Sequence, residues 1–219
     1  MTNAIKVFAP ATVANVVCGY DILGFAIDCP GDEVVMRLTS KPGIVIKKIT
    51  GDEGRLPLNA DKNTVGVGVQ HYLNHIGKPQ QGVEIELYKK MPIGSGLGSS
   101  SASTSAGLVA INRLFNNLLT PRELIPFAMQ GEEIACGSAH ADNVAPAILG
   151  GFVLIRSYQP LDIIQLPYPD NLHCAIIFPH VDVPTRDARQ MIRNSVLLKD
   201  AVTQWGNIAG LVSGLFMKD

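Results

Sequence analysis

Three glycines alternate with other residues in one short stretch, Pro92-Ile93-Gly94-Ser95-Gly96-Leu97-Gly98-Ser99-Ser100-Ser101-Ala102. A glycine has no Cβ, so its backbone can approach an anion closely, and successive backbone N–H groups can form a concave anion site. The serines add hydroxyl groups that can donate hydrogen bonds or bind a cation. Residue types and spacing together predict a loop that holds the phosphates of a nucleotide.

The segments on either side of this loop support the same prediction. Residues 83–89 alternate apolar and polar side chains as a strand does, and apolar residues from Leu108 to Leu118 recur at helical spacing. The loop therefore leads into a helix N-terminus, where free N–H groups and the positive end of the helix dipole favour a phosphate. A flexible Gly/Ser linker is the alternative, and it requires neither a strand before it nor a helix behind it.

The common nucleotide-binding motifs fit this loop less well. A P-loop ends in Gly-Lys-Ser/Thr, and a dinucleotide-binding loop reads G-x-G-x-x-G, with its third glycine one residue later than Gly98. The pattern Pro-x-x-x-Gly-Leu-Gly-Ser-Ser-x-Ala instead resembles the phosphate loop of the GHMP kinases, which phosphorylate galactose, homoserine, mevalonate and phosphomevalonate. The resemblance implies that residues 92–102 bind ATP, with Asn63 beside the adenine or ribose.

Three further segments resemble the homoserine kinase branch of that family. Residues 9–24, APATVANVVCGYDILG, are similar to its N-terminal motif, and residues 140–146, HADNVAP, to its H-x-D-N-V-A-P segment. Residues 184–189, PTRDAR, resemble its T-x-x-A-R segment. Asn143 is the most discriminating position, because galactose and mevalonate kinases carry an aspartate there.

Homoserine has an ammonium group, a carboxylate and a hydroxyl, and each needs its own partner. Asp21 suits the ammonium group, and the planar guanidinium of Arg189 suits the carboxylate. The resemblance assigns the remaining positions of this substrate site to Asn15, His140, Asn143 and Thr185.

For the chemical step, the resemblance implies Mg²⁺ and three catalytic residues, Ser100, Glu132 and Asn143. Ser100 and Glu132 match the family's metal-binding pair and offer the hard oxygen ligands that Mg²⁺ prefers. Because position 143 is not an aspartate, we expect direct attack by the hydroxyl, with its proton lost to a phosphate oxygen or to solvent.

Each assignment also has a structural alternative. Asp21 could cap a turn, and His140 could be a hydrogen-bonded core residue. His71 and His75 have the i, i+4 spacing of metal ligands but lack the glutamate of H-E-x-x-H, so a surface helix face is expected there.

Composition restricts the class of protein. The 219 residues are 47% hydrophobic and 17% charged, which is typical of a globular protein. A net charge of −1 offers no electrostatic footprint for nucleic acid or an anionic membrane. No apolar run reaches transmembrane length, and the four cysteines form no C-x-x-C pair. We expect a cytoplasmic protein with a small-molecule substrate, which binds neither nucleic acid nor membrane.

Hydrophobic periodicity and turn signals predict an α+β fold in two domains. Strands are expected at 5–9, 33–39, 44–49, 83–89, 151–156 and 173–178, and helices at 63–76, after the loop, at 120–136, 186–194 and 201–217. The resemblance implies an N-terminal ATP-binding domain over 1–150, like the second domain of ribosomal protein S5, and a ferredoxin-like domain over 151–219. We expect this second domain to be incomplete, which puts the activity of the chain alone in question. The family resemblance also implies a homodimer.

The leading expectation is thus an ATP-dependent homoserine kinase that makes O-phospho-L-homoserine for threonine synthesis. Another GHMP kinase, acting on mevalonate or a sugar, is one alternative, and Asn143 and Arg189 argue against it. A non-catalytic binding protein of GHMP fold is the other, and it would have no need of Ser100 and Glu132.

Overall fold

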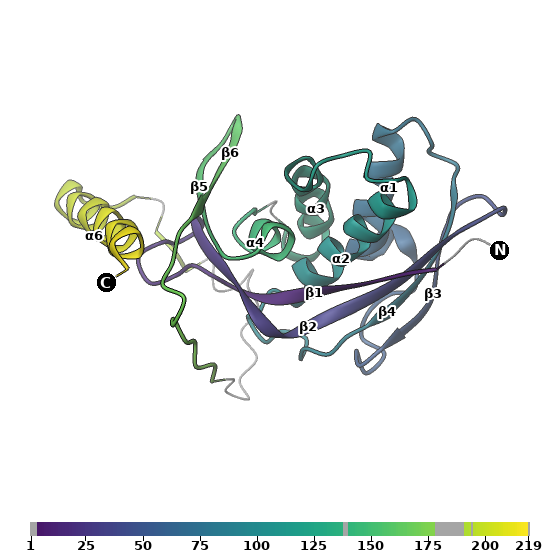
Figure 1. Cartoon of the computed structure of the whole chain (residues 1–219), viewed down its shortest axis with the longest axis horizontal. Coiled ribbons are helices and arrows are strands. Elements are labelled where there is room, and N and C mark those ends of the chain that lie inside the picture. Colours follow the sequence, from purple (N-terminus) through teal and green to yellow (C-terminus); the bar gives the residue numbers. More distant parts are fainter. Residues whose placement is uncertain (1–3, 138–139, 178–190, 194, 219) are drawn as a thin grey trace.

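The computed structural model describes residues 4–137, 140–177, 191–193 and 195–218 (Figure 1). Within them, one six-stranded sheet has the order β3-β4-β2-β5-β6, and β1 pairs with β2 outside this path. The strands are β1 (Ile5–Ala14), β2 (Leu23–Thr39), β3 (Ile44–Thr50), β4 (Gly82–Tyr88), β5 (Phe152–Tyr158) and β6 (Leu161–Leu166). The β3–β4 pair is parallel, and the other pairs are antiparallel. The long strand β2 is central because it contacts β1, β4 and β5.

The helices are η1 (Ala60–Lys62), α1 (Thr64–His75), α2 (Ser99–Leu114), α3 (Pro121–Cys136), α4 (Val144–Leu149) and α6 (Leu198–Met217). Figure 1 shows α1 to α4 gathered on one side of the sheet and α6 at the far end, beyond β5 and β6. Leu215 of α6 is buried in a small apolar cluster with Leu23, Phe152 and Leu166. The main core lies between the sheet and helices α1 to α4.

Alternation along the strands decides which face of the sheet is covered. In β4, Val83, Ile85 and Leu87 are buried, while Glu84 points to the opposite face and binds Arg37 at 2.8 Å. One face is therefore apolar and packs against the helices, and the other carries charged side chains in solvent.

The helix that follows the glycine loop, α2, is rich in small residues and is buried on most of its surface from Ser101 to Asn112. A Cβ added to Gly131 of α3 would lie 2.6 Å from the Thr64 carbonyl oxygen and 2.8 Å from Thr104 Cγ2. The absence of a side chain there lets α3 approach α1 and α2 closely. This close packing brings the residue after Gly131, Glu132, to the start of α2.

Most predicted elements are confirmed, including the helix at 120–136 with its capping box and Pro121 at the first turn. The prediction of a strand at 173–178 is wrong for its described residues 173–177, which form no strand. The first half of β2, strand β6 and helix α4 were missed. The helix predicted at 186–194 falls largely outside the described residues, and Met191–Arg193 are not helical.

The strands that follow Gly151 continue the N-terminal sheet. Leu23, Gly24 and Phe25 of β2 pair with residues 152–154 of β5, and β5 pairs with β6. Strands β5 and β6, which follow residue 150, are therefore part of the same sheet as the N-terminal strands. In the part of the chain that the structure describes, no helix has the length and hydropathy needed to cross a membrane.

Candidate active site

The glycine loop connects β4 to α2 in a strongly turned conformation. Gly94, Gly96 and Gly98 have φ values of 78°, 73° and 62°, in the left-handed region that glycine adopts most readily. Gly98 is the N-cap of α2. A Cβ on Gly98 would overlap Thr12 Oγ1 and lie 2.8 Å from Asn143 Oδ1, so the loop is packed directly against both side chains.

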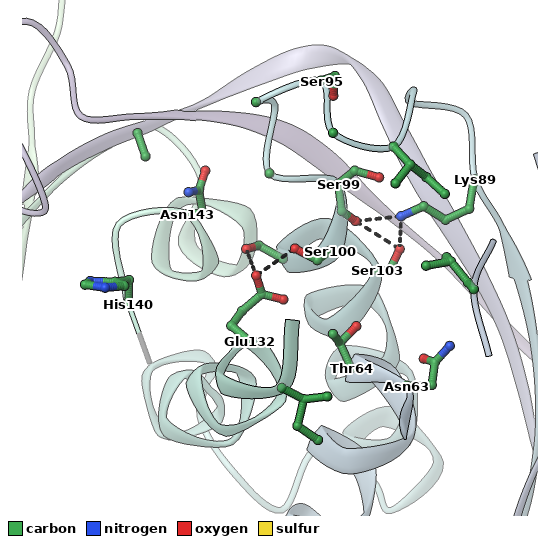
Figure 2. A pocket seen from close by; sticks show the side chains of 18 of the residues that line it. Asn63, Thr64, Lys89, Ser95, Ser99, Ser100, Ser103, Glu132, His140 and Asn143 are labelled. Atoms are coloured by element: carbon green, nitrogen blue, oxygen red, sulfur yellow. Dashed lines mark hydrogen bonds between the residues drawn. The ribbon is translucent and has the colours of Figure 1, made fainter. Parts of the chain in front are cut away.

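This loop, α2 and the segment after α3 line a cavity of about 560 Å³ (Figure 2), within the usual size range of small-molecule sites. Of the expected site residues, those that line it are Asn15, Asn63, Ile93, Gly94, Ser95, Gly96, Gly98, Ser99, Ser100, Ser101, Glu132, His140 and Asn143. In Figure 2, His140 and Asn143 lie toward one end, Asn63 and Lys89 toward the other, and Glu132 and Ser100 between them. One cavity therefore contains the expected phosphate, metal and amino-acid positions.

Other expected residues stand apart from this lining. Pro92, Leu97 and Ala102 belong to the loop and α2 without lining the cavity, and Thr185 and Arg189 lie outside the described residues. Asp21 is beside the cavity, with its Oδ1 3.8 Å from Nδ1 of His140. The Asp21 backbone N–H donates to Asn15 Oδ1 at 2.8 Å, which joins two of the predicted substrate residues.

Glu132 has the chemistry of a cation ligand. Its Oε2 accepts hydrogen bonds from the hydroxyls of Ser100 at 2.7 Å and Ser101 at 2.9 Å. Its Oε1 is buried and has no hydrogen-bond partner among the described residues. Burial raises the pKa of the Glu132 carboxyl above its usual value, so a cation beside Oε1 would favour the ionised form.

These residues fit Mg²⁺ better than a metal that needs an all-protein cage. No group of three or more His, Cys, Asp or Glu side chains converges on a possible metal position within the described residues. A single carboxylate with a neighbouring hydroxyl is instead typical of Mg²⁺, which takes its remaining ligands from phosphates and water.

A buried ion pair that sequence analysis missed holds both ends of the glycine loop. Lys89 Nζ binds Asp32 Oδ2 and also donates to the Ser99 carbonyl at 2.7 Å and to Ser103 Oγ at 2.6 Å. Asp32 Oδ1 accepts the Lys90 N–H at 2.9 Å. The exposed fractions of the Lys89 and Asp32 side chains are 2% and 0%. Asp32 therefore joins the residues before the loop to those after it.

A signal for this pair was present in the strand patterns. Lys89 follows Val83, Ile85 and Leu87 in the same alternation, and Asp32 precedes Val34 and Met36, so both charges fall on the buried face of neighbouring strands. Charged residues in phase with a core face need a partner. The pairing itself spans 57 residues and has no local signature.

Thr12 is a second residue whose role was missed. The β1–β2 register shifts between Pro10 and Thr12, which is typical of a bulge near a functional site. The buried Thr12 donates its N–H to the Leu97 carbonyl at 3.0 Å and its hydroxyl to Asn143 Oδ1 at 2.7 Å. Because the amide oxygen of Asn143 is engaged by this bond, its NH₂ group is the end offered to a ligand.

Two polar residues on the cavity wall, Asn63 and Ser95, differ in what they can bind. The Asn63 side chain accepts from the Val65 N–H at 3.1 Å and donates to the Pro57 carbonyl at 3.0 Å, so it caps α1 and shapes the wall. The buried Ser95 Oγ has no hydrogen-bond partner among the described residues. An anion held by the loop would supply an acceptor for that hydroxyl.

Comparison with known proteins matches this chain to one family model and to homoserine kinases. The family described as GHMP kinases N terminal domain matches residues 63–151. The homoserine kinase of Chlorobium phaeobacteroides is 49% identical over 221 residues, which cover 97% of this chain and 69% of that protein. The homoserine kinase of Methanococcus maripaludis is 39% identical and is covered to 70% of its length.

Solved structures agree with these sequence matches. The crystal structure of homoserine kinase from Cytophaga hutchinsonii superimposes with a TM-score of 0.95 at 61% identity, covering 100% of this chain and 69% of that chain. The mevalonate kinase of Methanococcus jannaschii gives a TM-score of 0.57 at 19% identity over 76% of this chain and 56% of its own, which shows a shared fold alone.

Proposed function

Because the chain belongs to the homoserine kinase family of the GHMP kinases, we propose that it uses ATP to phosphorylate the hydroxyl of L-homoserine, giving O-phospho-L-homoserine. The observation that carries the proposal is the shared cavity. In it, the Glu132 Oε1, which has no hydrogen-bond partner among the described residues, and the Ser100 hydroxyl line the same space as the glycine loop and Asn143. A kinase needs these three parts side by side, because phosphoryl transfer depends mainly on positioning and charge neutralisation.

The glycine loop is the proposed binding site for the triphosphate of ATP. Its left-handed glycines turn the backbone of residues 94–98 toward the N-terminus of α2, where the dipole favours negative charge. Ser95 adds a hydroxyl donor on the cavity wall, since its Oγ has no hydrogen-bond partner among the described residues. The other end, lined by Asn63 and Thr64, is left for the nucleoside.

Glu132 and Ser100 are the proposed ligands of Mg²⁺. When bound, the ion supplies positive charge that stabilises the phosphate oxygens as the phosphoryl group moves. Ser101 holds the second carboxylate oxygen of Glu132 at 2.9 Å, and this bond fixes the direction of Oε1.

For homoserine, we assign the ammonium group to Asp21 and the carboxylate to Arg189. Asn143 offers its amide NH₂ to the substrate hydroxyl, while Asn15, His140 and Thr185 complete the site. An amide cannot act as a general base at neutral pH, so we infer that the hydroxyl proton passes to a phosphate oxygen or to solvent.

The finer assignments are part of the same proposal. We place an ATP-binding domain like the second domain of ribosomal protein S5 at residues 1–150 and a ferredoxin-like domain after residue 151. The enzyme would be a cytoplasmic homodimer that supplies O-phosphohomoserine to threonine synthesis. The chain spans about 69% of the length of the relatives that it matches, so the experiments below use the full-length protein.

ADP release in a coupled assay tests the function. Homoserine, mevalonate and galactose are supplied separately with ATP and Mg²⁺, and we expect turnover with homoserine at least about a hundredfold above the other two, since the zwitterion makes two charge-assisted contacts. Equal or greater turnover with mevalonate or galactose would assign the chain to another GHMP reaction. No turnover with any of the three would favour a binding protein.

A further inference from the structure

The loop that joins β1 to β2 contains three residues other than glycine in the left-handed conformation, which asparagine and aspartate tolerate and valine does not. Asn15, Val17 and Asp21 have φ values of 56°, 49° and 60°. A left-handed conformation is uncommon outside glycine and is an outlier for a β-branched valine. Strain of this kind persists only where surrounding contacts maintain it, and it is concentrated at binding sites.

Both backbone polar groups of Asp21 are held by side chains. Its N–H donates to Asn15 Oδ1 at 2.8 Å, and its carbonyl accepts the hydroxyl of Tyr158 at 2.9 Å. The Asp21 carboxylate can therefore point in only a limited range of directions. In the proposed site this carboxylate binds the ammonium group of homoserine.

The Tyr158 hydroxyl also contacts the second segment of the same site. It accepts the backbone N–H of Ala141 at 3.3 Å, so one oxygen bridges Asp21 and the residue beside His140. The ring meets that of His140 edge to face, with centroids 6.3 Å apart and an interplanar angle of 87°. Asp21 and Ala141 are far apart in the sequence, and the Tyr158 hydroxyl links their backbones.

Tyr158 itself comes from a well-anchored element. It is the last residue of β5, whose Ile155 N–H donates to the Ile22 carbonyl at 2.7 Å. Val153 and Ile155 are buried in the main core. The Tyr158 hydroxyl therefore connects the Asp21 loop and the segment at Ala141 to each other and also to the anchored strand β5.

We propose that Tyr158 is a positioning residue of the amino-acid site, whose hydroxyl fixes the distance between the Asp21 carboxylate and the His140–Asn143 segment. The inference rests on the proposed function, because Asp21 and Asn143 must bind homoserine for their spacing to affect turnover. Tyr158 is assigned no contact with the substrate. Its effect is exerted through the substrate's partners, in a reaction where orientation strongly affects rate.

The test compares two tyrosine-to-phenylalanine variants of the full-length protein. Tyr158→Phe keeps the ring and removes the bridging hydroxyl. Tyr72→Phe is the matched control, since its buried hydroxyl donates to Asn112 Oδ1 at 3.1 Å in the helical core. We expect Tyr158→Phe to raise KM for homoserine about three- to tenfold, the effect of one net hydrogen bond, with KM for ATP unchanged. Tyr72→Phe should lower the melting temperature without changing either KM.

A double-variant cycle with Asp21→Asn shows whether Tyr158 acts through Asp21. If it does, adding Tyr158→Phe to Asp21→Asn should raise KM for homoserine less than twofold, because the carboxylate that it positions is already absent. A full additive effect, an unchanged KM for homoserine in Tyr158→Phe, or an equal rise in both KM values would overturn the inference.

The wild-type protein separates this inference from the proposed function. If wild type phosphorylates homoserine and Tyr158→Phe is indistinguishable from it, only the positioning role fails. If wild type does not phosphorylate homoserine, the proposed function fails and the positioning role fails with it.

Discussion

Replacing Asp32 by asparagine tests whether the glycine loop is held in advance of ligand binding. The change keeps the shape of the side chain and removes the charge that faces Lys89. The amide NH₂ would also meet donors, because Asp32 Oδ2 accepts the hydroxyls of Ser99 at 3.2 Å and Ser103 at 2.8 Å. The variant leaves a buried ammonium group without its partner.

The expected loss of stability in Asp32→Asn follows from the burial of Lys89 and Asp32. Since Lys89 and Asp32 are 2% and 0% exposed, solvent does not screen the remaining charge, and removing one partner of such a pair costs about 3–5 kcal/mol. Glu33→Gln is the matched control on the same strand. Glu33 binds Lys6 at 3.0 Å and Lys90 at 2.9 Å, and the side chains of these two lysines are 60% and 52% exposed. Removing the Glu33 charge should therefore lower the free energy of unfolding by at most about 1 kcal/mol.

Urea unfolding gives the free energy of unfolding, and ATP titration reports on the loop. We expect Asp32→Asn to lower both stability and ATP affinity, and Asp32→Asn with Lys89→Met to recover stability while ATP affinity stays low, because the loop is still untied. A loss of stability below about 1 kcal/mol in Asp32→Asn, with normal ATP affinity, would refute the anchoring role of this pair.

Four other substitutions test separate parts of the site. In Glu132→Gln, turnover should collapse while homoserine binding, measured by calorimetry, survives; near-normal activity at limiting Mg²⁺ would reject Glu132 as a ligand. Because burial raises the folded-state pKa of Glu132, the folded protein holds its proton more tightly than the unfolded chain. Without metal, the free energy of unfolding should therefore fall as the pH rises from the usual carboxyl pKa through the raised pKa of Glu132. Urea titrations of Glu132→Gln should not show this fall. Gly98→Ala should weaken homoserine and ATP binding, since its Cβ would displace Thr12 and Asn143. Gly96→Ala, whose added Cβ meets no protein atom within 4 Å, should leave homoserine affinity unchanged, and equal effects of the two substitutions on homoserine affinity would contradict this packing. Asp21→Asn should reduce homoserine affinity about ten- to a hundredfold with ATP affinity retained. A selective loss of ATP affinity would show that Asp21 belongs to the nucleotide site and not to the amino-acid site.

The glycine loop and its flanking elements could be predicted because their signals are local in sequence. The glycine spacing, the strand pattern before the loop and the helical pattern after it all fall within residues 83–118. Family membership is confirmed by relatives such as the homoserine kinase of Chlorobium phaeobacteroides. The contacts that hold the loop are not local. Asp32 and Lys89 are 57 residues apart, and Thr12 and Asn143 are 131 apart.

The errors in the predicted fold have related physical causes. Residues 173–177 have an apolar strand-like pattern, but periodicity does not supply a neighbouring strand, and Ile177 is 89% exposed. The first half of β2 was missed because Pro30 and Gly31 are residue types typical of a strand end, whereas the chain continues through them to pair with β1. The roles assigned to the site residues stay predictions.

The most direct test of the account is identification of the product by ³¹P NMR and mass spectrometry after incubation of the full-length protein with ATP, Mg²⁺ and L-homoserine. The account predicts one phosphate monoester on the side-chain oxygen of homoserine, formed in equal amount with ADP and lost in Glu132→Gln. ADP formed without a phosphorylated amino acid, or phosphorylation of the carboxylate instead of the hydroxyl, would contradict it.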